Sequence, residues 1–198
     1  MSSNLKPGLH CKEIARKAKG ILKQIAKAFH YRDRNIFLNL YKKYVRVHLE
    51  YSSPSWCPWQ TGDIEDLEKV QKKAVGMISG LQGTNYEEKL RELKLPSLKL
   101  RRMRADMIQT FKIIRGVDKV DKDTWFKPTI PGRPATRNVN NNGIENGMQV
   151  LFQHTEIGKN FFSTRATKEW NLLPETVKSA LTISVFKKRL DVHIESKI

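Results

Sequence analysis

Cysteine is scarce in this chain: Cys11 and Cys57 are the two cysteines among 198 residues. Two thiols so far apart in the sequence supply neither a disulfide framework nor a metal-ligand spacing. The C-terminal tail has no cysteine from which a zinc knuckle could be built. We therefore expect two reduced thiols in an intracellular protein, nuclear or cytoplasmic, that binds no metal and no cofactor.

Long apolar runs are also missing. No run approaches the roughly 18 residues needed to span a bilayer, and the N-terminus carries no apolar segment of the kind found in signal peptides. We expect neither secretion nor membrane insertion. A hydrophobic content of 39% and a charged content of 29% are ordinary for a folded protein, and 198 residues suffice for a sizeable core.

Acidic residues are few compared with basic ones. The chain has 20 Asp and Glu against 37 Lys and Arg, which gives a net charge of +17 and a pI near 10.0. Residues 1–60 hold 12 of the basic and 3 of the acidic residues, so the excess is concentrated there. Such a balance favours a polyanionic partner, nucleic acid before an anionic membrane. The alternative is an ordinary solvated surface.

The first basic segment has the pattern of an amphipathic helix over residues 11–29. Apolar residues recur every three or four positions from Ile14 to Phe29, and cations occupy the other side. A membrane-surface or calmodulin-binding helix would have the same pattern. The cations that we assign to phosphate contacts are Lys12, Arg16, Lys19, Lys23 and Lys27.

A second helix is predicted to begin after Asp33, a good N-cap, and to end before Ser52-Ser53-Pro54. Its further candidate phosphate contacts are Lys42, Lys43 and Arg46. A compact aromatic turn follows, with Trp56 and Trp59. These two rings either stack on bases or close a hydrophobic core, and we favour the core.

Two more helices are predicted from their caps. Asp63 is expected to cap a helix that reaches Ile78, and its pairing with Asp66 is read as capping and dipole stabilisation instead of catalysis. Asn85 and Glu88 form a capping box for a helix over Tyr86–Leu93.

A long fifth helix should run from Ser97 to about Arg115, with Gly116 as its stop. Three arginines lie near its start, where the helix dipole disfavours cations. Local helix stability does not explain them, so we suspect a phosphate or an acidic partner for Arg101, Arg102 and Arg104.

The amino-acid composition of the chain changes after Val120. Between Pro128 and Gly147, 11 of 20 residues are Pro, Gly or Asn, which indicates a linker or long loop. A short strand over Met148–Gln153 and helices over residues 161–172, 174–180 and from Thr182 onward should follow. The expected fold is mainly α, with a helical domain over residues 11–116, a linker over 117–147 and a small helical segment over 148–198.

Several segments, in order, resemble the thumb and C-terminal region of non-LTR retrotransposon (LINE) reverse transcriptases of the jockey and chicken-repeat branch. The resemblance implies a helical thumb that grips a primer–template or RNA–DNA hybrid by its phosphates, and it makes residues 1–10 the end of the polymerase palm. It also implies the missing palm and fingers as partners. The segments are His10–Leu22, Tyr31–Trp59, Leu67–Gly83, Tyr86–Leu98, Arg101–Ile113, Asn160–Arg165, Trp170–Val177 and Phe186–Leu190.

The palm of that family holds two metal ions through a Phe- or Tyr-x-Asp-Asp turn, and this sequence contains no Asp-Asp pair. We therefore expect the isolated chain to bind nucleic acid with little sequence reading and to polymerise nothing. Two alternatives remain: a relic of a truncated element that folds partly or not at all, and a co-opted basic adaptor for a protein or lipid surface.

Overall fold

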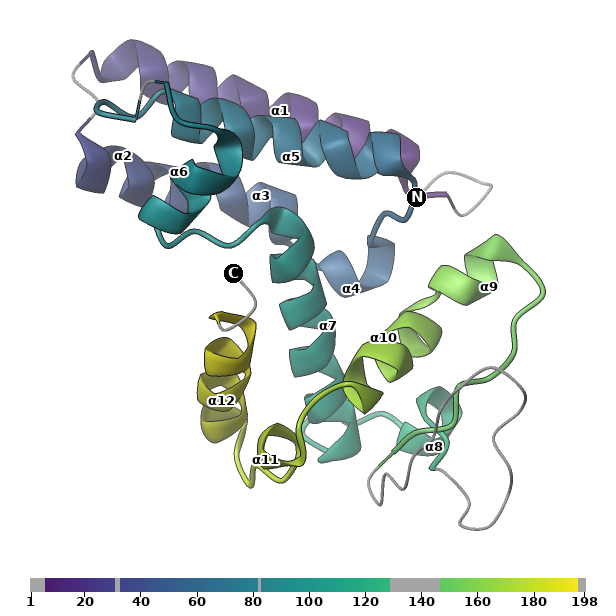
Figure 1. Ribbon diagram of the computed structural model, residues 1–198. Helices are drawn as coiled ribbons and strands as arrows, with labels where there is room; N and C mark the ends of the chain where they lie inside the picture. Colours follow the sequence, from purple (N-terminus) through teal and green to yellow (C-terminus); the bar gives the residue numbers. More distant parts are fainter. Residues whose placement is uncertain (1–5, 31–32, 82, 129–146, 196–198) are drawn as a thin grey trace. The chain divides into compact units, whose positions relative to one another are not determined.

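The computed structural model describes residues 6–30, 33–81, 83–128 and 147–195. It is mainly helical, as the sequence predicts (Figure 1). The chain divides into two compact units, Met1–Arg102 (unit 1) and Met103–Lys197 (unit 2). The division lies inside helix α7 (Leu98–Ile114), whereas the sequence suggested a single helical domain up to residue 116.

Unit 1 contains the predicted helices with shifted boundaries. The predicted N-cap Asp33 is confirmed, because its Oδ1 accepts from the backbone N–H of Asn35 at 2.9 Å and of Ile36 at 3.1 Å. The second predicted helix is interrupted by a π-helical turn. The elements are α1 (Gly8–Ala28), α2 (Arg34–Leu40), η1 (Tyr41–Val45), α3 (Arg46–Glu50), α4 (Ser53–Trp56), α5 (Thr61–Gly76), α6 (Tyr86–Glu92) and the start of α7.

The core of unit 1 forms where α1 lies alongside α5 (Figure 1). Cys11, Ala15, Ala18 and Leu22 face inward at alternating spacings of four and three residues, and each is at most 3% exposed. Small side chains at these positions let the two helix backbones approach closely, and α5 fills the interface with larger residues such as Leu67. The apolar stripe of α1 is therefore covered within the unit.

A buried hydrogen-bond chain fixes the π-helical turn. The Tyr41 hydroxyl donates to Gln71 Oε1 at 2.7 Å, and Gln71 Nε2 donates to the Tyr86 hydroxyl at 3.2 Å. Tyr86 in turn donates to Glu68, which also accepts from the Leu98 backbone N–H at 3.2 Å. Burial raises the pKa values of both tyrosines. The chain thus joins η1, α5, α6 and the first residue of α7 through satisfied polar groups.

Asp63 does not cap its helix as predicted. Helix α5 begins at Thr61 after the N-cap residue Gln60, so Asp63 lies inside the first turn, where it is 7% exposed. Its carboxylate lies against Gly8, where an added Cβ would meet both carboxylate oxygens at 3.1 Å. The first turn of α1 contains no acidic residue, so Asp63 supplies the negative charge that the positive end of the α1 dipole favours.

The capping box of α6 and the ends of α7 are confirmed. Asn85 Oδ1 accepts from the Glu88 backbone N–H at 2.9 Å, and Glu88 accepts from that of Asn85 at 3.0 Å. Ser97 Oγ accepts from the Leu100 N–H at 3.3 Å, and Gly116, at φ +65°, follows the end of the helix.

Unit 2 contains the rest of α7 and several shorter helices. The sequence predicted at most a short β element over Met148–Gln153, and in the described residues this segment forms no strand beyond an isolated bridge between Met148 and Pro128. Residues 129–146, which include most of the predicted linker, lie outside the described residues. The further helices are α8 (Lys122–Trp125), α9 (Glu156–Asn160), α10 (Phe162–Asn171), α11 (Glu175–Lys178) and α12 (Ile183–Glu195).

The core of unit 2 is aromatic. The rings of Phe111 and Phe186 stack with centroids 4.3 Å apart, and the Trp170 ring also stacks on Phe186, with centroids 5.8 Å apart. Met107 and Leu190 are fully buried in the same unit. Large rings from α7, α10 and α12 thus replace the close helix pairing that builds unit 1.

Candidate nucleic-acid interface

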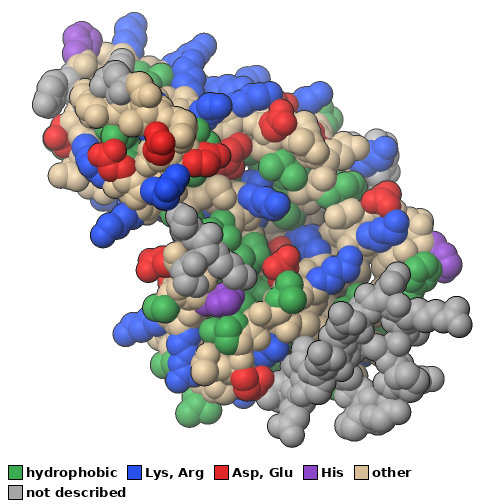
Figure 2. All heavy atoms as spheres, in the orientation of Figure 1, with side chains coloured by type: hydrophobic (Ala, Val, Ile, Leu, Met, Phe, Trp, Pro, Cys, Tyr) green, Lys and Arg blue, Asp and Glu red, His purple; other side chains and the backbone are tan. Residues whose placement is uncertain are grey.

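The cations of α1 form one stripe along the helix, hereafter the α1 stripe. Steps of four, three, four and four residues place them on one side, next to the covered apolar face. Four are exposed, and Lys19 is half-buried. Figure 2 shows blue Lys and Arg side chains gathered where Figure 1 places α1. The stripe consists of Lys12, Arg16, Lys19, Lys23 and Lys27.

The spacing of the cations in the α1 stripe is comparable to the spacing of phosphates along a nucleic-acid strand. At a rise of 1.5 Å per residue it extends over about 22 Å, so one cation follows another about every 5 to 6 Å. A nucleic-acid strand carries one charge per about 3.4 Å of duplex axis, a comparable density. Among the described residues, no carboxylate lies within ion-pair distance of these five side chains. Their charge is therefore available to an external anion.

A second group of cations surrounds Glu50. Arg101 forms a two-pronged ion pair with this carboxylate, with Nε–Oε1 at 2.8 Å and Nη2–Oε2 at 2.7 Å. Arg46 Nε lies 3.3 Å from Glu50 Oε1, four residues earlier on α3. Burial, together with the positive charges of Arg46 and Arg101, lowers the pKa of Lys42. Two arginines thus share one carboxylate and Lys42 lies within their field, so a bound phosphate would relieve the mutual repulsion of the three cations.

The predicted arginine cluster at the start of α7 is not a free cationic surface. Arg101 is paired as above, and Arg102 is 2% exposed, so its assignment as a surface phosphate contact is wrong. Arg104 makes a two-pronged ion pair with Asp191 of α12, with Nη2–Oδ2 at 2.8 Å. Carboxylates of the same chain therefore explain why Arg101 and Arg104 stand in this helix turn.

Trp56 belongs to the core of unit 1, as the sequence analysis favoured. It is 6% exposed, and its Nε1–H donates to the backbone carbonyl of Tyr51 at 2.8 Å. The His10 ring meets its edge with centroids 5.1 Å apart.

Trp59 is half-buried and Lys43 is exposed. Of the two candidate phosphate contacts in η1, Lys42 and Lys43, Lys43 is thus the more accessible.

One participant, Glu50, was not predicted from the sequence. Lys17, a further exposed cation of α1, lies on a different side from the stripe and takes no part in it. Glu50 organises Arg46 and Arg101, and its only sequence signal is the i, i+4 spacing from Arg46. Its pairing with Arg101 spans 51 residues and leaves no local pattern.

Comparisons of the chain with protein-family models, with curated proteins and with solved structures find no match. Over the described residues, no helix combines the length and apolarity that crossing a membrane requires. Within the same residues, no group of three or more His, Cys, Asp or Glu side chains is arranged to hold a metal ion.

Proposed function

We propose that this chain is a nucleic-acid-binding module that grips duplex or RNA–DNA hybrid backbones through phosphates, with unit 1 as its main contact. The observation that carries the proposal is the α1 stripe, whose five cations have no carboxylate partner among the described residues. The pair Arg46 and Arg101 on Glu50, with Lys42 within their field, offers a second anchoring point. Phosphate contacts of this kind give affinity and register with little sequence reading.

The same helix supports a membrane-surface role less well. An amphipathic helix binds a bilayer or calmodulin by burying its apolar face in the partner. In α1 that face is occupied by the packing on α5, with Cys11, Ala15, Ala18 and Leu22 at most 3% exposed. The charged stripe remains available, and the apolar stripe does not. A polyanion that needs charge alone is the better partner.

We also propose that the chain is related to the reverse transcriptases of LINE retrotransposons. The resemblance of the ordered segments to the thumb and C-terminal region of LINE reverse transcriptases suggests a helical module that holds the primer–template of such a polymerase. The mainly helical fold and the charge of +17 are compatible with this origin. The absence of an Asp-Asp pair supports a binding role for this chain and no polymerase activity of its own.

The test is the salt dependence of binding to a fluorescein-labelled RNA–DNA hybrid, followed by anisotropy. If about five phosphates are neutralised, log K should fall against log salt with a slope of roughly −4 to −5 between about 50 and 200 mM. Replacing Lys19, Lys23 and Lys27 together by Gln should flatten the slope by up to about 3 and weaken different sequences alike.

A matched control removes the same charge elsewhere. The Lys119→Gln/Lys168→Gln/Lys188→Gln variant loses three exposed cations of unit 2 and should keep the wild-type slope within about 1. Equal flattening in both triple variants would reduce the effect to net charge and defeat the assignment to α1. A flat salt dependence of the wild type would remove the proposal altogether.

A further inference from the structure

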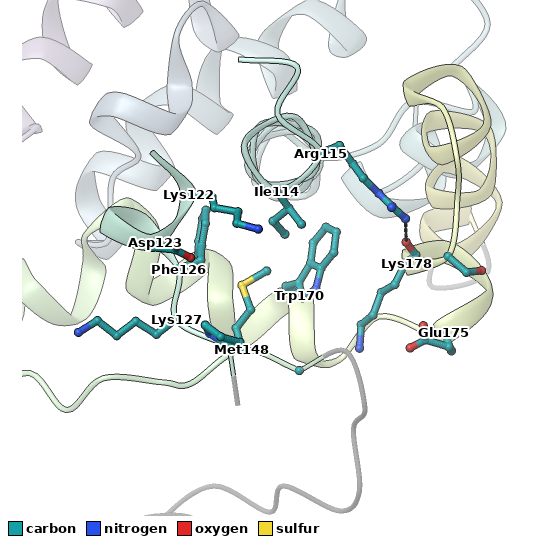
Figure 3. A pocket seen from close by; sticks show the side chains of 13 residues that line it. Ile114, Arg115, Lys122, Asp123, Phe126, Lys127, Met148, Trp170, Glu175 and Lys178 are labelled. Atoms are coloured by element: carbon teal, nitrogen blue, oxygen red, sulfur yellow. Dashed lines mark hydrogen bonds between the residues drawn. The ribbon is translucent and has the colours of Figure 1, made fainter. Parts of the chain in front are cut away.

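Unit 2 contains a cavity of about 510 Å³ between the end of α7, α8, α10 and α11 (Figure 3). Phe126, Met148 and Trp170 form its apolar wall, and each is at most 6% exposed. In Figure 3 the Trp170 ring, the Ile114 side chain and the Lys122 amine point toward the same space. A volume of this size accommodates a small organic ligand.

Hydrogen bonds hold the walls in place. The Asn171 side chain accepts from the Met148 N–H at 2.9 Å and donates to the Met148 carbonyl at 2.8 Å. The Gln149 N–H donates to the Lys127 carbonyl at 2.8 Å. Arg115 Nη2 donates to the Ala180 carbonyl at 3.0 Å and fixes the residues after α11. The cavity is therefore formed before any ligand enters.

One wall carries a buried lysine with a single acceptor among the residues that the structure describes. Lys178 is 6% exposed, and its ammonium donates to the Asn171 carbonyl at 3.5 Å, the outer limit of a hydrogen bond. Burial lowers its pKa, and Glu175 one turn earlier opposes that change. An ammonium can donate three hydrogen bonds, and leaving it buried with one weak bond is costly. An anionic oxygen in the cavity would supply the missing acceptors.

The charges of the lining residues narrow the class of anion. Lys127 extends away from the cavity in Figure 3, so Arg115, Lys122 and Lys178 stand against two carboxylates, Asp123 and Glu175, an excess of one positive charge. An excess of positive charge favours an anion such as a phosphate monoester, which carries about −1.5 to −2 at neutral pH. Arg115 donates to the Ala180 carbonyl, so Lys122 and Lys178, whose amines lie on either side of the Trp170 ring in Figure 3, are the remaining cationic donors.

We propose that this cavity binds a nucleoside monophosphate. Its phosphate oxygens accept from Lys178 and Lys122, and its base lies against the apolar wall of Trp170 and Phe126. The carboxylate of Asp123, which also lines the cavity, accepts from a ribose hydroxyl. The inference concerns unit 2 and does not rest on the α1 stripe. The nucleotide is either free or the phosphorylated end of a strand, because both present the same chemistry.

The test is isothermal titration calorimetry of the full chain with adenosine monophosphate, adenosine and ribose 5-phosphate. Adenosine monophosphate should bind, and the two fragments should each bind at least about ten-fold more weakly, because each lacks half of the contacts. Lys178→Met should weaken the nucleotide about ten- to hundred-fold without lowering the melting temperature, since Met keeps the length and removes a buried charge. Lys119→Gln, an exposed cation outside the cavity, is the matched control.

Three results would overturn the proposal: no heat of binding with adenosine monophosphate, an unchanged Kd in Lys178→Met, or the same loss in Lys119→Gln. If the Lys178→Met variant does not fold, the Lys122→Gln variant is measured instead. Lys122 is exposed, so its substitution should leave the fold intact and weaken nucleotide binding at least several-fold. Tighter binding of a 5′-phosphorylated than of a 5′-hydroxyl oligonucleotide, lost in the same variant, would identify a strand end as the occupant. Equal binding of the two oligonucleotides would identify the free nucleotide.

Discussion

The five cations of the α1 stripe, in unit 1, have no carboxylate partners among the described residues, whereas the described arginines of unit 2 are bonded within the unit. Arg104 pairs with Asp191, Arg115 donates to the Ala180 carbonyl, and Arg165 pairs with Asp106 at 2.8 and 3.0 Å. Four of the five stripe residues are lysines. A planar arginine fork fits a buried carboxylate, and a flexible, strongly hydrated lysine suits a solvated surface. Net charge alone therefore does not locate a binding surface.

The largest effect should come from removing a buried ring in unit 1. Trp56→Ala should lower the free energy of unfolding of unit 1 by about 4 kcal/mol, because a cavity replaces the ring and the bond to the Tyr51 carbonyl is lost. Hydrogen exchange followed by mass spectrometry should show faster exchange in α1 and α5. The salt slope of hybrid binding should stay the same in the fraction that remains folded. A large change in slope with little loss of stability would instead make Trp56 a base-stacking residue.

Replacing Arg165 of unit 2 should lower the free energy of unfolding nearly as much as replacing Trp56. Arg165→Met leaves the Asp106 carboxylate, 7% exposed at its side chain, without its two-pronged partner and should cost about 3 kcal/mol in urea unfolding. The double variant Arg165→Met/Asp106→Leu should recover most of that loss, because no buried charge is then left unpaired. Recovery of less than about 1 kcal/mol would show that the pair contributes by packing.

What the sequence predicted and what it missed follow a physical division. The Asp33 cap, the Asn85–Glu88 box and the Gly116 stop depend on atoms within four residues, and all three are confirmed. The arginines of α7 depend on partners 51 residues away for Arg101 and 87 residues away for Arg104. No local pattern encodes such partners, so the same residues looked like an unexplained cluster.

The same division applies to the helix starts and to the proposed site. Asp63 was misassigned because its carboxylate lies against Gly8 of another helix, a tertiary contact. The α1 stripe was predictable because helical spacing alone places its members on one side. The cavity of unit 2 was not, since its walls come from segments between Ile114 and Ser179 that have no common motif.

The buried thiol of unit 1 should make that unit sensitive to alkaline pH. Burial raises the pKa of Cys11 from its ordinary value of 9.0 to about 12, with a further contribution from Asp63. The raised pKa means that the unfolded state ionises first, so this contribution is fully present below pH 9.0 and is lost as pH rises toward 12. From pH 9.0 to 10.0 the Cys11 thiol alone should account for a loss of about 1 kcal/mol, and the buried Tyr41 and Tyr86, whose ordinary pKa is 10.0, add a smaller decline that is the same in a variant lacking the thiol.

The control for the thiol is Cys11→Ala. Its stability is lower at every pH, but its decline between pH 9.0 and 10.0 should be shallower than that of the wild type by the same amount, about 1 kcal/mol. The aromatic cluster of unit 2, Phe111, Trp170 and Phe186, has no ionisable side chain and should add nothing in this range. Parallel pH profiles for the two proteins would mean that Cys11 ionises as easily in the folded chain as in the unfolded one.

The smallest effect on stability should come from the residues with the largest proposed effect on binding. Replacing Lys19, Lys23 and Lys27 by Gln should change the free energy of unfolding by less than about 0.5 kcal/mol, because Gln retains helix propensity and no ion pair of these lysines is lost. Removing three like charges from one side of a helix should even stabilise it slightly at low salt. Urea unfolding of the triple variant, at the salt concentrations of the binding assay, measures this directly. A loss above about 2 kcal/mol would place the lysines among structural residues, like the arginines of unit 2, and the contrast between the two units would disappear.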